Sequence, residues 1–411
     1  MTTVSPRAGA VAGRGGIESP YAWRLAIVSM LCIALGGGGI YLPMVGLKEM
    51  AAEFGGQRAV PSFAYMVGFF GMGVGGVFMG WLADRTSPRV PLLIASVAIG
   101  VGGFVTASGG VLTLYVGYTV LLGFFGNAGT FTPAMNNVPG WFDRRRNIAV
   151  AIVSVGPAIS GSVWPQVYRF LIPEIGWRQT LTIYGVVAGV LLLLGALYVR
   201  PAPILRGPGR RREEKVDLPL PSSAIMVLLS AAGFCCCAAM ALPFVHMVAY
   251  CGDLGYPAAR GSEAVSLVLI SAIVATFVMA RLADRIGPLP VSLLCSTIQI
   301  GSLVGFMVAR DITSIYALSL LHGIPFIAIV QGYALNLRFL YGPTIAGWRL
   351  GVVMLFAMAG MAVGGWLGGA IFDATLSYRL AFQAALAFNL LNLMLLGALY
   401  MAQRRRVVSL P

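Results

Sequence analysis

The chain alternates between long apolar runs and short polar segments. Most runs hold about 20 residues with few charges, the length of helix that crosses a hydrocarbon core about 30 Å thick. Twelve such runs occur, and the pattern predicts an all-α membrane protein with twelve transmembrane helices. The predicted spans are Trp23–Val45, Ser62–Leu82, Val90–Ser108, Val111–Asn136, Ile148–Tyr168, Thr180–Val199, Ser222–Ala249, Ala264–Leu282, Leu289–Val308, Ser314–Leu337, Leu350–Ile371 and Leu380–Met401.

The tetrapeptide Leu-Ala-Asp-Arg occurs at Leu82–Arg85 and again at Leu282–Arg285, a spacing of 284 − 84 = 200 residues. Each copy lies between two apolar runs, and such internal repeats are typical of transporters. The long polar stretch Arg206–Asp217 separates the sixth and seventh runs. We therefore expect two pseudo-symmetric six-helix bundles. The expected boundaries are 1–22 for a cytoplasmic tail, 23–199 for the first bundle, 200–221 for a cytoplasmic linker, 222–402 for the second bundle and 403–411 for a second tail.

Composition agrees with a membrane protein, because 58% of the residues are hydrophobic, 10% are charged and the mean hydropathy is +0.85. With the N-terminus in the cytoplasm, 21 of the 28 Lys and Arg residues fall on the inner side. This bias predicts that both termini are cytoplasmic. The net charge of +14 is then a topology signal, and no nucleic-acid partner is expected. We expect a multi-pass protein of a bacterial inner membrane with an uncleaved first span.

One segment, Gly71 to Gly76, matches the dinucleotide-binding pattern G-x-G-x-x-G. It lies inside an apolar run with no strand before it, so the structural context for nucleotide binding is missing. The spacings from Gly71 to Gly75 and from Gly76 to Gly80 instead favour close packing of helices. Because the chain also lacks a hydrolase elbow, a phosphate-binding loop and a metal-ligand cluster, we expect no enzyme activity, no cofactor and no metal.

Several motifs resemble those of the major facilitator superfamily. The segment Gly80–Arg89 resembles its signature, and Arg281–Gly287 is a degenerate copy in the second half. Trp141–Arg146 and His246–Tyr250 resemble the monocarboxylate transporter and oxalate/formate antiporter branch. The resemblance implies the fold of that superfamily (the MFS fold), with two bundles that rock about a central cavity. It also implies a cytoplasmic gate held by charge pairing, whose candidates are Asp84, Arg85, Arg89, Arg144, Arg145, Asp284 and Arg285.

The sequence departs from this branch at two positions. In the branch, the eighth span carries an Arg about eight residues before the loop Asp, and this Arg is held to bind the substrate carboxylate. Here the corresponding residue is Thr276, and Ala264–Ala280 contains no basic residue. The Lys of the eleventh span in oxalate carriers is also absent from Leu350–Ile371. The fourteen acidic residues all map to loops or helix ends, so no intramembrane carboxylate is expected.

Neutral polar and titratable side chains are therefore the candidates for contact with a solute. Gly36–Gly39 would loosen the first span near mid-membrane, where discontinuous helices often form binding sites. The candidates for substrate binding are Tyr41, Asn127, Thr130, Trp164, Thr276, His322 and Gln331. His246 and His322 titrate near neutrality and are the candidates for proton coupling. The competing interpretation for each is a structural hydrogen bond between helices.

The leading hypothesis is a secondary active transporter that moves a small organic anion, a monocarboxylate, by alternating access. Proton symport or anion exchange would drive it. The first alternative is an efflux carrier for a neutral or amphipathic solute, because the expected charge anchor is missing. The second, ranked lowest, is a transporter-like sensor, because only short segments flank the outermost spans. The expected partners are the solute, protons and the lipid bilayer, and a monomer is expected to suffice.

Overall fold

The computed structural model describes residues 16–203, 220–341 and 347–408, and every regular element within these ranges is helical. η1 is a π-helix and η2 a 3-10 helix. The predicted linker segment Arg206–Asp217 lies outside the described residues. In chain order the elements are α1 (Pro20–Gly36), α2 (Gly38–Val45), α3 (Leu47–Glu53), α4 (Ala59–Arg85), α5 (Arg89–Ser108), α6 (Val111–Val116), η1 (Gly117–Asn127), α7 (Ala128–Asn137), η2 (Val138–Trp141), α8 (Arg146–Ser154), α9 (Gly156–Tyr198), α10 (Ser222–Asp253), α11 (Ala258–Ile286), α12 (Pro288–Val308), α13 (Ile312–Tyr341), α14 (Gly347–Thr375) and α15 (Arg379–Val408).

Eleven helical stretches in the described part of the chain are long and apolar enough to cross a membrane. One of them includes α9 and contains two crossings, because α9 bends at Gly176, where φ is 78° and ψ is 162°. Glycine adopts this positive φ without the steric penalty that other residues incur. Gly176 thus separates the fifth and sixth spans where the sequence predicts a loop. The predicted fold class, an all-helical membrane protein of twelve spans, is confirmed.

Some helices run beyond their predicted apolar cores. α10 continues to Asp253 rather than ending at Ala249, and α11 begins at Ala258 rather than Ala264. Hydropathy marks only the part of a helix that suits lipid. The additional turns carry charged side chains, such as Asp253 and Arg260, that make contacts at the end of the molecule. These turns therefore belong to the helices although their composition is polar.

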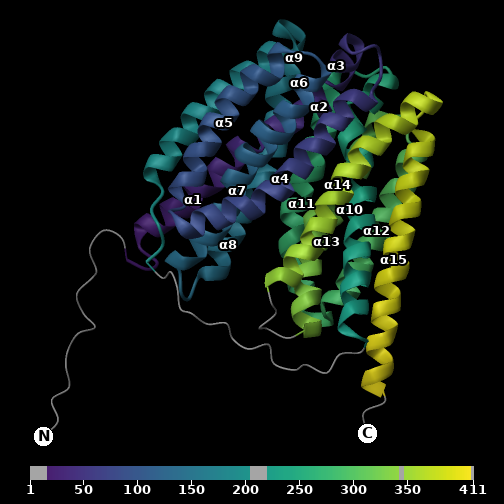
Figure 1. Cartoon of the computed structure of the whole chain (residues 1–411). Coiled ribbons are helices and arrows are strands. Elements are labelled where there is room, and N and C mark those ends of the chain that lie inside the picture. The colour runs from purple at the N-terminus through teal and green to yellow at the C-terminus, as the bar shows by residue number, and fades with distance from the viewer. Residues whose placement is uncertain (1–15, 204–219, 342–346, 409–411) are drawn as a thin grey trace, which may run out of the picture.

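The helices form two groups, α1–α9 and α10–α15, which we call the first half and the second half. The halves meet mainly where α4 packs on α14 and where α9 packs on α11. Figure 1 shows that the two halves approach each other toward one end of the molecule and diverge toward the other. We call the end at which α1 begins and α15 ends the terminal end. The opposite end, where the halves approach, is the far end.

Glycines make the closest helix contacts in the first half. A Cβ added at Gly71 of α4 would lie 2.1 Å from the carbonyl oxygen of Thr119, and one at Gly75 would lie 2.3 Å from that of Phe124. Both carbonyls belong to η1, so only glycine permits this approach of the two backbones. At Gly73, between them, the nearest atom to an added Cβ is a Leu355 methyl at 3.9 Å. The predicted packing role of Gly71 and Gly75 is confirmed.

Candidate functional site

The first transmembrane span is interrupted where the sequence predicts a loosened helix. α1 ends at Gly36 and α2 begins at Gly38. Carbonyl groups around the interruption accept hydrogen bonds from aromatic side chains of the later spans, so few backbone groups are left unsatisfied in the apolar interior. The bonds are Trp164 Nε1 to Ala34 O at 2.9 Å, Tyr184 hydroxyl to Leu35 O at 2.9 Å and to Gly36 O at 3.2 Å, Tyr168 hydroxyl to Gly38 O at 3.0 Å and Tyr118 hydroxyl to Gly39 O at 3.2 Å.

The first-half candidates for substrate binding lie around this interruption. The Tyr41 hydroxyl donates a hydrogen bond to the Pro157 carbonyl at 3.2 Å, and the Trp164 indole N–H donates to the Ala34 carbonyl of the first span. Thr130 donates to the Asn127 carbonyl at 2.8 Å and is buried against Gly36. The side-chain donors of Tyr41, Thr130 and Trp164 are therefore engaged within the first half in this conformation.

The second-half candidates lie apart from them. Thr276 donates to the Ala272 carbonyl at 2.7 Å, and with Gln331 it lines a small pocket between α11, α12 and α13. His322 is fully buried, with Nδ1 2.8 Å from the Ser302 hydroxyl and Nε2 3.3 Å from the Met240 carbonyl. The described pockets do not bring the candidates of the two halves together. Their role in binding a solute stays a prediction.

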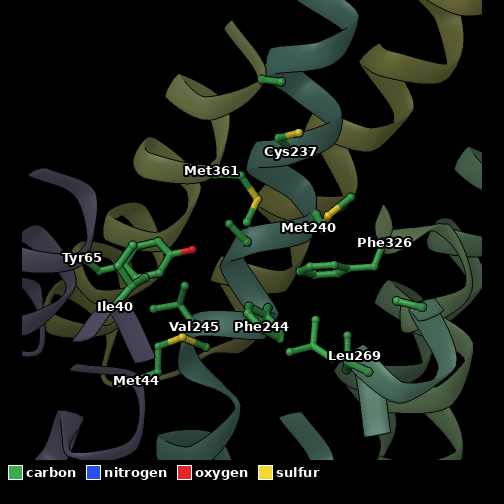
Figure 2. Packing of buried hydrophobic residues seen from close by; sticks show 14 of the residues in the cluster. Ile40, Met44, Tyr65, Cys237, Met240, Phe244, Val245, Leu269, Phe326 and Met361 are labelled. Carbon is green, nitrogen blue, oxygen red and sulfur yellow. The ribbon is translucent and has the colours of Figure 1, made fainter. Parts of the chain in front are cut away.

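Buried apolar side chains from both halves pack together, and we call this cluster the plug (Figure 2). Several of its members are methionine or aromatic side chains, which are large and polarizable, and methionine adapts its shape to fill gaps. None of its described members carries a formal charge. The plug residues are Ile40, Met44 and Tyr65 from the first half and Cys237, Met240, Phe244, Val245, Leu269, Phe326 and Met361 from the second.

Tyr65 brings a polar group into this plug. Its side chain is 1% exposed, and its hydroxyl has no hydrogen-bond partner among the described residues. Figure 2 shows the hydroxyl pointing from α4 toward α10 and Met361. A buried, unpaired hydroxyl is rare in native proteins and destabilises the fold unless a partner is present at some stage. The sequence analysis did not select Tyr65, because one tyrosine in an apolar span has no distinguishing local pattern.

A network of charges joins the halves at the far end, and we call it the far-end latch: Lys48, Arg58, Asp253, Asp373 and Tyr378. The Arg58 guanidinium binds both carboxylate oxygens of Asp253, at 2.5 and 2.7 Å, and the Tyr378 hydroxyl at 2.9 Å. Lys48 binds Asp253 at 2.7 Å. The Asp373 carboxylate accepts the backbone N–H of Arg58 at 2.9 Å. Lys48 and Arg58 belong to the first half, whereas the other three belong to the second.

A second contact closes the opposite side of the interface. Arg169 of α9 binds Glu263 of α11 at 2.8 Å, and Gln166 donates to the Ser266 hydroxyl at 2.7 Å. Within the described ranges, three ion pairs join the halves, and all three lie toward the far end. The far end is therefore closed in this conformation.

His246 connects the plug with the latch. Its Nε2 lies 2.9 Å from the Gly365 carbonyl, and its Nδ1 lies 3.0 Å from the Tyr378 hydroxyl. A carbonyl only accepts hydrogen bonds, so Nε2 donates and Nδ1 accepts from Tyr378 in the neutral ring. The Ser62 hydroxyl of the first half is 3.5 Å from Nε2. Of the two candidates for proton coupling, His246 is thus at the interface, whereas His322 is inside the second half.

The predicted gate residues lie at the terminal end. Arg85 packs over the Trp81 ring at 4.5 Å, and Arg89 donates to the Val199 carbonyl, so both contacts stay within the first half. The backbone N–H of Arg145 binds the Glu18 carboxylate at 2.7 Å. A gate held by charge pairs at this end stays a prediction. The exposed members of the set are Asp84, Arg85, Arg144, Arg145, Asp284 and Arg285.

An ion pair at the far end of the first half leads to a pH-dependent prediction. Hydrogen bonds from Arg178 and Trp177 hold the pKa of Glu53 below its ordinary value of 4.5. The stabilisation is present above that ordinary value and is lost as the pH falls through the lowered pKa. We expect Glu53→Gln to lower the melting temperature at pH 7 and to have little effect near pH 3. Glu49→Gln, at an exposed site in the same helix, is the control, and an equal loss at both pH values would contradict the assignment.

Two helical halves that meet at one end and are long enough to span a membrane form the arrangement seen in two-bundle transporters. Residues 27–345 match the family described as Major Facilitator Superfamily, and the chain belongs to this family. The resemblance found in the sequence is confirmed, and so is the expectation that the protein is a transporter and not an enzyme.

The relatives and solved structures agree with this assignment. The chain is 26% identical over 391 residues to monocarboxylate transporter 13 of Bos taurus, covering 91% of this chain and 88% of that protein. It is 25% identical over 302 residues to the agnestins efflux protein AgnL12 of Paecilomyces divaricatus, covering 71% and 67%. A crystal structure of a bacterial homolog of the human lysosomal transporter Spinster, described as inward-facing and occupied, has a TM-score of 0.72. That structure is 15% identical, covers 94% of this chain and 98% of its own, and shows the shared fold.

Proposed function

We propose that this protein carries a small monocarboxylate with an apolar body across a bacterial inner membrane by alternating access. The terminal end faces the cytoplasm, as the Lys and Arg bias indicates. The far-end latch then closes the outer side, and the halves rock to expose the centre to each side in turn. The similarity to monocarboxylate transporter 13 over most of both chains supports this substrate class.

The observation that carries the proposal is the unpaired Tyr65 hydroxyl in the apolar plug. A site with an apolar wall and one free hydroxyl suits a solute with an apolar body and one oxygen-rich group. When the halves separate, the Tyr65 hydroxyl donates to the carboxylate and gains the partner that it lacks in the closed conformation. Tyr41, Asn127, Thr130, Trp164, Thr276, His322 and Gln331 remain proposed contacts for other parts of the transport path.

The driving force is proton symport or anion exchange, and His246 is the proposed proton site. Its neutral ring fits the present hydrogen bonds, because Nδ1 accepts from Tyr378. A second proton on Nδ1 reverses that bond, so that Nδ1 donates to the Tyr378 oxygen and the Tyr378 O–H bond rotates away from the ring. Protonation thus acts on the latch from within the interface.

Replacing Tyr65 by phenylalanine tests the proposed site. We expect the KM for the transported carboxylate to rise about tenfold, because one hydrogen bond to a charged group contributes about 1.5 kcal/mol. The melting temperature should stay constant or rise, since an unpaired buried hydroxyl is removed. Both are measured on purified protein, by uptake into proteoliposomes and by thermal unfolding.

Tyr118→Phe is the matched control, because it removes the hydrogen bond to Gly39 O. It should lower the melting temperature and leave the KM near the wild-type value. An unchanged KM in the Tyr65 variant would contradict the proposed contact.

A second candidate function is efflux of a neutral or amphipathic solute. It is favoured by the uncharged, methionine-rich plug and by the similarity to the agnestins efflux protein. A thermal-shift screen of carboxylates, neutral solutes and lipophilic cations at two pH values separates the candidates, because a bound ligand raises the apparent stability. Stabilisation by a carboxylate, stronger at acid pH, supports the first function. A response only to neutral or lipophilic compounds supports the second.

A further inference from the structure

An apolar groove of about 570 Å³ runs along the outside of the first half, between α1 and the two segments of α9. Large apolar side chains on its rim are strongly exposed: Leu31 by 47%, Val163 by 49% and Leu194 by 58%. These side chains belong to membrane-spanning stretches, so the groove opens toward the acyl chains of the bilayer. It is separate from the plug between the halves.

The groove covers about two thirds of the depth of one leaflet. Along α1 it extends from Val28 to Leu35, which at 1.5 Å per residue is about 10 Å. Half of a hydrocarbon core is about 15 Å. Tyr198 lines the terminal-end side, and Trp164 closes the inner side near the interruption of the first span. The groove thus lies within the leaflet at the terminal end.

Two arginines lie at the terminal-end side of the groove. Arg24 is exposed and precedes Val28 by one helical turn, on the same face as Leu31. Arg200 lies 5.4 Å above the Tyr21 ring, and the Tyr21 hydroxyl donates to the Tyr198 carbonyl at 2.8 Å. This chain of contacts ties Arg200 to the wall of the groove.

Among the described residues, no carboxylate forms an ion pair with Arg24 or Arg200. The carboxylate nearest in sequence, that of Glu18, binds the backbone N–H of Arg145 instead. Two arginines that form no ion pair with a described carboxylate therefore lie beside an apolar groove that spans much of one leaflet. This pairing of charge and apolar surface matches the two parts of an anionic phospholipid.

We propose that the groove binds one anionic phospholipid of the leaflet at the terminal end. One acyl chain follows Val28, Leu31 and Leu35 toward Trp164, and the phosphate lies between Arg24 and Arg200. The transported solute is not the occupant, because the groove faces lipid and offers almost no polar surface for orienting a solute. Guanidinium groups are well suited to phosphate oxygens.

The test is native mass spectrometry of the full chain titrated with phosphatidylglycerol or phosphatidylcholine of the same acyl chains. We expect the wild-type protein to retain one phosphatidylglycerol in preference to phosphatidylcholine. In Arg24→Gln/Arg200→Gln this preference should fall about tenfold, while binding of phosphatidylcholine persists. Leu31→Trp, which places a bulky indole ring at the groove, should weaken the binding of both lipids.

Arg404→Gln is the matched control, because Arg404 lies at the terminal end of the second half and packs 5.5 Å from the Tyr400 ring. This contact resembles that of Arg200 but does not adjoin the groove. An unchanged preference in the double variant, an equal loss in the control, or normal retention of both lipids by Leu31→Trp would overturn the proposal. Melting curves of all variants establish that the fold is kept. The outcome does not depend on which solute is transported.

Discussion

Replacing Asp253 by asparagine is expected to raise the population with an open far end about 30-fold. Asp253 is the shared acceptor of Arg58 and Lys48, and the Arg58 side chain is only 12% exposed. Removing the carboxylate leaves a largely buried guanidinium and a nearby ammonium group without the negative charge that they share. Loss of one partner from a partly buried pair destabilises the closed form by about 2 kcal/mol, below the range for full burial. That energy corresponds to the stated change in population.

The population is measured as a distance distribution between spin labels at Ala52→Cys and Leu376→Cys, which lie on opposite halves at exposed far-end positions. The native cysteines are all buried and so react slowly. Asp311→Asn is the control, because this exposed far-end carboxylate accepts a hydrogen bond from the Ser314 backbone N–H in its own half and is in no ion pair between the halves. An unchanged distribution in the Asp253 variant would show that the latch does not hold the closed form.

Substituting alanine at Gly71 or Gly75 is expected to be the most destabilising small change in the first half. The added Cβ would meet backbone atoms of η1 at 2.1 or 2.3 Å, and a backbone moves aside less readily than a flexible side chain. Separating the two helices costs about 3 kcal/mol, the upper part of the range for overpacked cores. We expect a clear drop in the melting temperature and in the yield of folded protein.

Gly73→Ala provides the internal control for this prediction. The site is open, with its nearest neighbour at 3.9 Å, and alanine favours a helix over glycine by about 1 kcal/mol. The melting temperature should therefore hold or rise. If all three variants lost the same stability, the helix contact would not be the cause.

The fold was predictable because it depends on local composition. Apolar runs of about 20 residues place the spans, and glycines spaced by four residues place the tightest helix contacts. Gly36–Gly39 likewise indicates the interruption in the first span. None of these features requires knowledge of a distant partner, so the sequence is sufficient for them.

The site was less predictable because its contacts join distant segments. Arg58 and Asp373 are 315 positions apart, and neither has a local pattern that names its partner. In the sequence, His246 and His322 look alike because both lie in apolar spans. In the structure, His246 reaches the interface between the halves, whereas His322 contacts Ser302 of its own half. Among the described tyrosines, Tyr65 is the one whose hydroxyl is buried without a partner, and this is a property of the packed structure.

The interrupted first span has a consequence for the motion of the protein. Side chains from η1 and from both segments of α9 donate hydrogen bonds to the carbonyl groups on either side of the interruption. The bend therefore cannot straighten unless several hydrogen bonds break together. The first half therefore keeps one shape, and we expect the proposed rocking motion to break and remake the contacts between the two halves.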